Sequence, residues 1–66
     1  MNKSNELKEK ILKEMFLLIQ KKPGIRPREL NLLLRLKHSA SLRNSLIKRR
    51  LIRKVKKGIA VHYYSI

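Results

Sequence analysis

The sequence predicts one α+β domain in which three helices are followed by a two-stranded β-hairpin. Apolar residues recur with helical spacing from Leu7 to about Arg50. After Leu51 and Ile52 the pattern changes to the alternation of a half-buried strand. Breakers at Pro23-Gly24 and at Gly58 interrupt these patterns. All 66 residues are assigned to one domain with a thin core, because so short a chain buries about 60% of its unfolded surface.

The first helix is expected from about Ser4 to Lys22, and Pro23-Gly24 ends it. Leu17 falls outside its apolar face. It is either an ordinary exposed leucine or part of a helix that also packs on a second subunit. The residues expected on the apolar face are Leu7, Ile11, Leu12, Met15, Phe16, Leu18 and Ile19.

A single extended residue and a second helix are expected next. Ile25 stands between breakers and is expected to lie beside a sheet. The second helix should run from Pro27 to about Leu36, because proline is tolerated in a first helical turn. Leu32 should be on its far side. The leucines expected on its inner face are Leu30, Leu33 and Leu34.

The third helix is expected from Ser39, a plausible N-cap, to Arg49 or Arg50. The connection of about three residues between the second and third helices predicts a helix-turn-helix. Leu42 and Leu46 should point inward.

The C-terminal hairpin is expected to pair strands at Arg53–Lys56 and Ile59–Ile66 across a turn at Lys57-Gly58. Gly58 adopts a positive φ without steric cost, which places the turn near it. Tyr63 and Tyr64 should point to opposite faces, so that one of them anchors the hairpin on the core.

The charge of the chain indicates a polyanionic partner. Eighteen Lys and Arg against four Glu give a formal charge of +14 and a pI near 11.1. Nucleic acid is the first candidate and an anionic membrane surface the second. The 42% of apolar residues argue for a folded module rather than a disordered basic tail.

Several other classes of protein are disfavoured by the residue inventory. The longest apolar run, Met15–Ile19, is too short to span a membrane, and the N-terminal pattern is unlike a signal peptide, so we expect a cytoplasmic protein. His38 and His62, without cysteine, do not predict a metal site, and no cofactor is expected. An enzyme is not expected either, because aspartate, a glycine-rich phosphate loop and a convincing nucleophile–base–acid set are missing.

The pattern of leucines and turns resembles the winged helix-turn-helix superfamily of small bacterial, archaeal and viral transcription regulators. The resemblance is carried by Arg26-Pro27-Arg28-Glu29-Leu30, Leu33-Leu34-Arg35-Leu36, Leu42, Leu46, Arg50-Leu51-Ile52 and the ending Tyr63-Tyr64-Ser65-Ile66. It implies a third helix in the major groove and a hairpin that acts as a wing. Arg35 and Arg50 depart from it, because they occupy places where these families commonly carry glycine.

The candidate DNA contacts lie on the second and third helices and on the hairpin. Asn44 could pair with adenine, and Arg43, if it is rotated toward the groove, with guanine. The flanking cations and the basic hairpin would contact phosphates. The residues expected to bind DNA are Arg26, Arg28, Lys37, Ser39, Ser41, Arg43, Asn44, Ser45, Lys48, Arg53, Lys54, Lys56 and Lys57.

The sequence therefore predicts a small transcription regulator that binds double-stranded DNA at specific sites, as a homodimer through its first helix. The alternative is a non-specific DNA- or RNA-binding module of a replication or ribonucleoprotein assembly. A protein-interaction adaptor is the third hypothesis, which the high charge disfavours.

Overall fold

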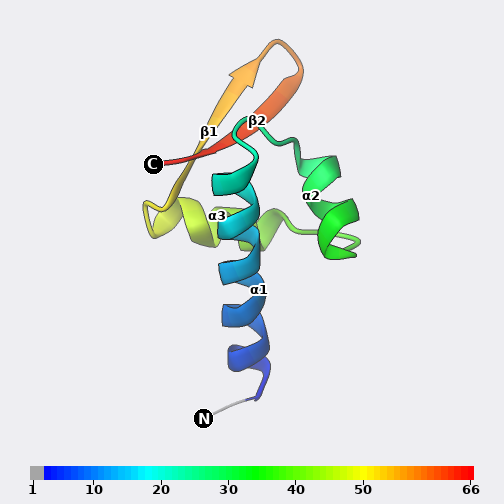
Figure 1. Ribbon diagram of the computed structural model, residues 1–66, viewed down its shortest axis with the longest axis vertical. Coiled ribbons are helices and arrows are strands. Elements are labelled where there is room, and N and C mark those ends of the chain that lie inside the picture. The colour runs from blue at the N-terminus through cyan, green and yellow to red at the C-terminus, as the bar shows by residue number, and fades with distance from the viewer. Residues whose placement is uncertain (1–2) are drawn as a thin grey trace.

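The computed structural model describes residues 3–66, with side chains described from Glu6 onward, and it confirms the three helices followed by a hairpin (Figure 1). This α+β order is the layout of a winged helix-turn-helix domain. In chain order the elements are α1 (Lys3–Lys21), α2 (Pro27–Leu34), α3 (Ala40–Lys48), β1 (Ile52–Lys57) and β2 (Ala60–Ser65). Since α1 already includes Lys3, Ser4 lies within the helix.

Helix α1 packs on the rest of the molecule with the C-terminal part of its length. Leu12, Met15 and Ile19 are buried at helical spacing. The N-terminal turns extend beyond the body of the domain (Figure 1). Leu7, the first residue of the expected apolar face, is therefore 62% exposed. Leu17 is exposed, as expected.

Ile25 forms the single bridge expected of it. It pairs in antiparallel fashion with Tyr63, on the edge of β2 that β1 leaves free. The Tyr63 amide donates to the Ile25 carbonyl and the Gly24 amide donates to the Tyr63 carbonyl, each at 2.9 Å. Gly24 has φ +85°, and a Cβ there would lie 3.3 Å from the Tyr64 hydroxyl. Glycine is thus favoured at this position because of the positive φ and because a side chain would crowd Tyr64.

Helix α2 ends two residues earlier than expected, at Leu34. Arg35 adopts φ 55°, its amide donates to the Leu32 carbonyl at 3.3 Å, and the Leu36 amide donates to the Asn31 carbonyl at 2.8 Å. These two bonds define a Schellman motif, which terminates a helix. The connection to α3 is consequently five residues long, 35–39. Leu30 is buried and Leu34 half-buried, but Leu33 is 47% exposed, contrary to expectation.

Helix α3 ends in the same way. The Arg50 amide donates to the Ile47 carbonyl at 2.9 Å and the Leu51 amide to the Leu46 carbonyl at 3.1 Å, with Arg50 at φ 58°. This second Schellman motif stops the helix at Lys48 and turns the chain into β1.

The hairpin pairs β1 with β2 from Ile52–Ser65 to Lys57–Ala60. Its two-residue loop is Gly58-Ile59, one position later than expected. Gly58 has a positive φ of 61°, whereas the φ of Ile59 is not positive. This combination is the pattern of a type II′ turn. The second strand therefore begins at Ala60 and ends at Ser65, and Ile59 is fully exposed at the hairpin tip.

The core draws on every element. Tyr63, 5% exposed, is the tyrosine that anchors the hairpin, while Tyr64 lies on the opposite face. The remaining buried apolar residues are Leu12, Met15, Ile19, Ile25, Leu30, Leu46 and Ile52. Within residues 3–66, no helix is both long and apolar enough to cross a membrane.

Candidate nucleic-acid interface

Helix α3 presents a polar stripe on its outer side. Ser41, Asn44 and Lys48 are exposed and Ser45 is partly exposed, at spacings of three and four residues that place them on one face. Leu46 is buried and Leu42 is partly buried against the core. The separation of polar and apolar faces expected from the sequence is thus confirmed.

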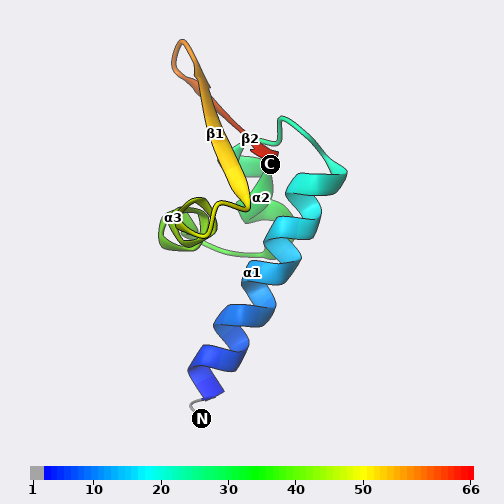
Figure 2. The ribbon, with the colours of Figure 1, turned by 90° about the vertical axis from the view of Figure 1, so that its left-hand side faces the viewer.

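The hairpin rises directly beyond α3. Figure 2 shows α3 end-on with the hairpin above it, both on one side of α1. Because β1 follows α3 after three residues, 49–51, the C-terminal end of α3 lies next to the base of the hairpin.

The hairpin carries exposed cations on both faces. Lys54 and Lys56 lie on the face of buried Tyr63, because each strand residue shares its face with its cross-strand partner. Arg53 and Lys57 lie on the other face, opposite Tyr64 and Ala60. All four side chains are exposed.

Arg53 is positioned by an aromatic ring. Its guanidinium carbon lies 5.4 Å from the centroid of Tyr64, its cross-strand partner. A cation over a tyrosine face is attracted by the ring quadrupole. The base of the wing thus holds one arginine in a preferred direction while leaving it exposed.

Arg43 is not part of the outer stripe. Its guanidinium carbon lies 5.6 Å from the centroid of Tyr63, and its Nε and Nη1 atoms are buried without a hydrogen-bond partner. The reason is helical geometry: Arg43 adjoins Leu42 and precedes Leu46 by three residues, which places it on the inner half of α3. The rotation toward the groove that a guanine contact requires is absent from this conformation.

Ser39 is also turned inward. It is 2% exposed, and its hydroxyl donates to the Asn31 side-chain carbonyl on α2. Ser39 does occupy the N-cap position of α3, but its side chain makes no capping bond because the hydroxyl is used between the helices. It joins α2 to α3 and is not available on the surface.

The remaining cations of the predicted site, Arg26, Arg28 and Lys37, are exposed around α2. Arg26 is the N-cap residue of α2, and together with Arg28 it lines a shallow pocket of about 230 Å³ that also includes Glu29. Glu29 forms an ion pair with Lys22 rather than with either arginine, with 3.6 Å between Oε1 and Nζ.

Negative charge is confined to the N-terminal part of the chain. After Glu29 there are ten Lys and Arg and no acidic residue, so α3 and the hairpin contain no carboxylate side chain. Such a surface attracts polyanions.

Groups of three or more potential metal-ligating side chains are not found in the described part of the chain.

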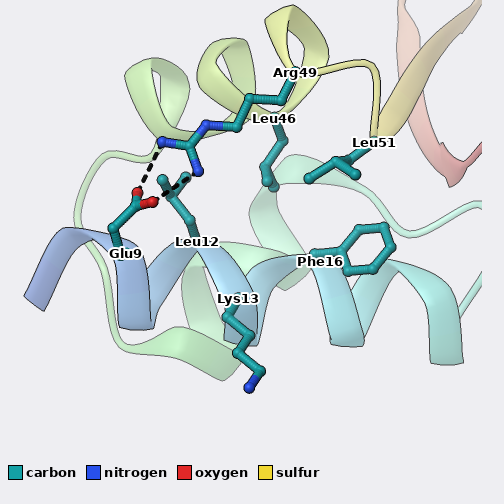
Figure 3. A pocket seen from close by; sticks show the side chains of 7 residues that line it. All are labelled: Glu9, Leu12, Lys13, Phe16, Leu46, Arg49 and Leu51. Atoms are coloured by element: carbon teal, nitrogen blue, oxygen red, sulfur yellow. Dashed lines mark hydrogen bonds and ion pairs between the residues drawn. The ribbon is translucent and has the colours of Figure 1, made fainter. Parts of the chain in front are cut away.

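One cation of the C-terminal half is neutralised from α1. Arg49 donates two hydrogen bonds to the Glu9 carboxylate, at 2.8 and 2.9 Å (Figure 3). The hydrogen bond from Arg49 lowers the pKa of the Glu9 carboxyl below its ordinary value. The pair closes one side of an apolar pocket of about 340 Å³, lined by Leu12, Phe16, Leu46 and Leu51, and Lys13 points away from the pair (Figure 3).

Two exposed arginines next to α3, Arg35 and Arg50, were missed as candidate contacts. A signal for them existed in the sequence. Each stands at a place where the superfamily that the chain resembles commonly carries glycine, the residue that often ends a helix in the left-handed conformation.

No protein-family model, curated protein or solved structure matches the chain. The interface therefore rests on the geometry and charge described above.

Proposed function

We propose that this protein binds double-stranded DNA at specific sites as a small transcription regulator. In this proposal α3 enters the major groove and the basic hairpin contacts the backbone or the minor groove. One observation carries the proposal: α3, with its exposed polar stripe, is followed directly by a hairpin with four exposed cations, and neither α3 nor the hairpin contains an acidic residue.

The dimensions and chemistry of α3 support a place in the groove. An α-helix with its side chains is about 10–12 Å in diameter, and the major groove, about 12 Å wide, admits one helix. In helix-turn-helix docking the N-terminal half of the recognition helix contacts base edges. Ser41 and Asn44 are the exposed hydrogen-bonding residues of that half, and Asn44 can pair with the two edge atoms of adenine.

The surrounding cations supply the phosphate contacts. Eight residues of the predicted site are exposed and cationic, namely Arg26, Arg28, Lys37, Lys48, Arg53, Lys54, Lys56 and Lys57. If six to eight of them neutralise phosphates, the plot of log affinity against log salt has a slope of about −5 to −7.

The inward position of Arg43 favours a second candidate function. Without Arg43, the outer stripe of α3 offers one amide, two hydroxyls and one ammonium group for base contacts. A helix with so few base-reading groups suits a non-specific DNA- or RNA-binding module of a replication or ribonucleoprotein assembly, whose affinity comes from phosphates.

Selection of duplexes from a random library, followed by salt titration of the winning and random sequences, tests the proposal. A specific regulator prefers the selected site by about 10³-fold or more. A preference below about tenfold with a steep salt slope indicates the non-specific module instead. A slope near zero on every nucleic acid contradicts both and favours a protein-interaction adaptor.

We also propose that two copies associate through α1. Leu17, Leu18 and Leu34 line an apolar groove of about 310 Å³ between α1 and α2, with Glu14 and Lys21 at its borders. Glu14 and Lys21 lie equally far in sequence from the Leu17–Leu18 midpoint. An antiparallel two-fold pairing centred there brings Glu14 of each copy opposite Lys21 of the other, and a two-fold interface is self-complementary in this way. Such a dimer matches a palindromic DNA site.

A further inference from the structure

Arg35 and Arg50 share a backbone conformation that disfavours arginine. Within residues 3–66 they are the two non-glycine residues with positive φ, 55° and 58°. Each is the left-handed residue of a Schellman motif, at the end of α2 and of α3 respectively. Glycine is the preferred residue at this place, because a Cβ crowds the following carbonyl in the left-handed region.

The fold itself gives little reason for arginine at these positions. Both side chains are exposed. Neither takes part in the ion pairs found among the described side chains, which join Lys22 to Glu29 and Arg49 to Glu9. A cation near a helix C-terminus gains a small dipole interaction that salt screens. A strained conformation that persists without structural benefit points to a function for the side chain.

The positions of the two arginines indicate what that function is. Arg35 begins the connection that leads into α3, and Arg50 lies in the connection that leads out of it to β1. The two arginines thus bracket the helix that carries the polar stripe. Guanidinium groups bind phosphate through two parallel hydrogen bonds, which makes arginine better suited than lysine to a fixed backbone contact.

We propose that Arg35 and Arg50 bind DNA backbone phosphates on either side of the groove segment that α3 occupies. The inference rests on the proposed function and adds two residues to the proposed contact surface. At both residues arginine lowers the stability of the fold and raises the affinity for DNA. One substitution should therefore have two opposite effects. Glycine removes the backbone strain, which stabilises the fold, and it also removes the guanidinium group that binds the phosphate, which weakens DNA binding.

The test uses the variants Arg35→Gly and Arg50→Gly, with thermal melts and duplex-binding titrations at several salt concentrations. We expect each variant to melt a few degrees higher than the original chain. At about 0.1 M salt, loss of one phosphate contact weakens binding about eightfold and makes the log–log salt slope shallower by about one. Lys10→Gln, which removes one charge from the exposed N-terminal part of α1, is the matched control and should leave the slope unchanged.

Two further variants separate the effect of backbone strain from the effect of the lost positive charge. Arg35→Asn and Arg50→Asn tolerate the left-handed conformation but carry no charge, so they should lose affinity as the glycine variants do. If the chain binds duplexes with a steep salt slope and the glycine and asparagine variants bind equally well, the inference is overturned while the proposed function stands. If the original chain shows no salt-dependent binding to duplexes, the proposed function itself fails. If glycine lowers the melting temperature, the arginines serve the helix ends and the exchange of stability for affinity is refuted.

Discussion

Glu9 and Arg49, forty residues apart in sequence, are joined by two hydrogen bonds of 2.8 and 2.9 Å that tie α1 to the residue following α3. Both side chains are about half exposed, so solvent and salt weaken the pair. It nevertheless links the C-terminal end of α3 to α1.

The Glu9–Arg49 pair predicts a pH-dependent stability. The pKa of Glu9 is lowered from about 4.5 in the folded chain, chiefly by the hydrogen bond from Arg49. The stabilising contribution is therefore fully present well above pH 4.5 and is lost as the pH falls through the lowered pKa. The melting temperature of Glu9→Gln should lie below that of the original chain at pH 7, and the difference should shrink in acid. Glu6→Gln, on the same helix, is the control; an equal effect of both variants would refute the specific role of the pair.

Asn44 and Lys56 should affect DNA binding in different ways. If Asn44 contacts a base edge, Asn44→Ala weakens binding to the selected site by about 1–3 kcal/mol and binding to random duplex much less. Lys56→Ala should weaken all duplexes alike and make the salt slope shallower by about one. Titration of both variants with both duplexes measures this contrast. Equal losses of affinity for both variants on both duplexes would contradict the placement of α3 in the major groove.

Arg43→Met should stabilise the fold. Arginine at this position buries Nε and Nη1 without acceptors, and burial of unpaired donors is costly. Methionine keeps much of the volume and gives up only the interaction with Tyr63, so the free energy of unfolding should rise by about 1 kcal/mol. Chemical denaturation measures the change. Arg53→Met removes the equivalent contact with Tyr64 at an exposed position and should bring no gain.

The proposed dimer predicts a charge-reversal experiment. Glu14→Lys places like charges across the two-fold interface and should produce a monomer, as should Lys21→Glu. The double variant restores opposite charges and should dimerise again. Sedimentation equilibrium reads the mass, and Leu32→Gln, at an exposed leucine outside the groove, is the control. A monomeric original chain contradicts the dimer directly.

Much of the fold could be predicted because its signals are local. Helical spacing located Leu12, Met15 and Ile19 in the core, the breakers around Ile25 indicated an extended residue, and Gly58 marked the turn. The exposure of Leu7 could not be predicted, because spacing defines a face but not the length over which that face is covered. The early ends of α2 and α3 were missed because arginine is an uncommon left-handed residue.

The candidate site was less predictable than the fold. The polar stripe of α3 and the exposed cations of the hairpin follow from periodicity. The inward position of Arg43 depends on where Tyr63 lies, and the burial of Ser39 depends on Asn31 in the preceding helix. The partner of Arg49 lies in α1 and that of Glu29 is Lys22. Such pairings are set by packing between elements, which the local pattern does not record.

The bridge between Ile25 and Tyr63 helps to hold the two proposed contact surfaces, α3 and the hairpin, in a fixed arrangement before a ligand binds. It secures β2 to the linker between α1 and α2, while the opposite edge of β2 is secured to β1. With Arg43 of α3 stacked on the same tyrosine, helix and hairpin are held at a preset angle. A preorganised pair of surfaces has little conformational entropy left to lose on association. Loss of this bridge should therefore weaken association by raising its entropic cost, while the groups that touch the ligand stay the same.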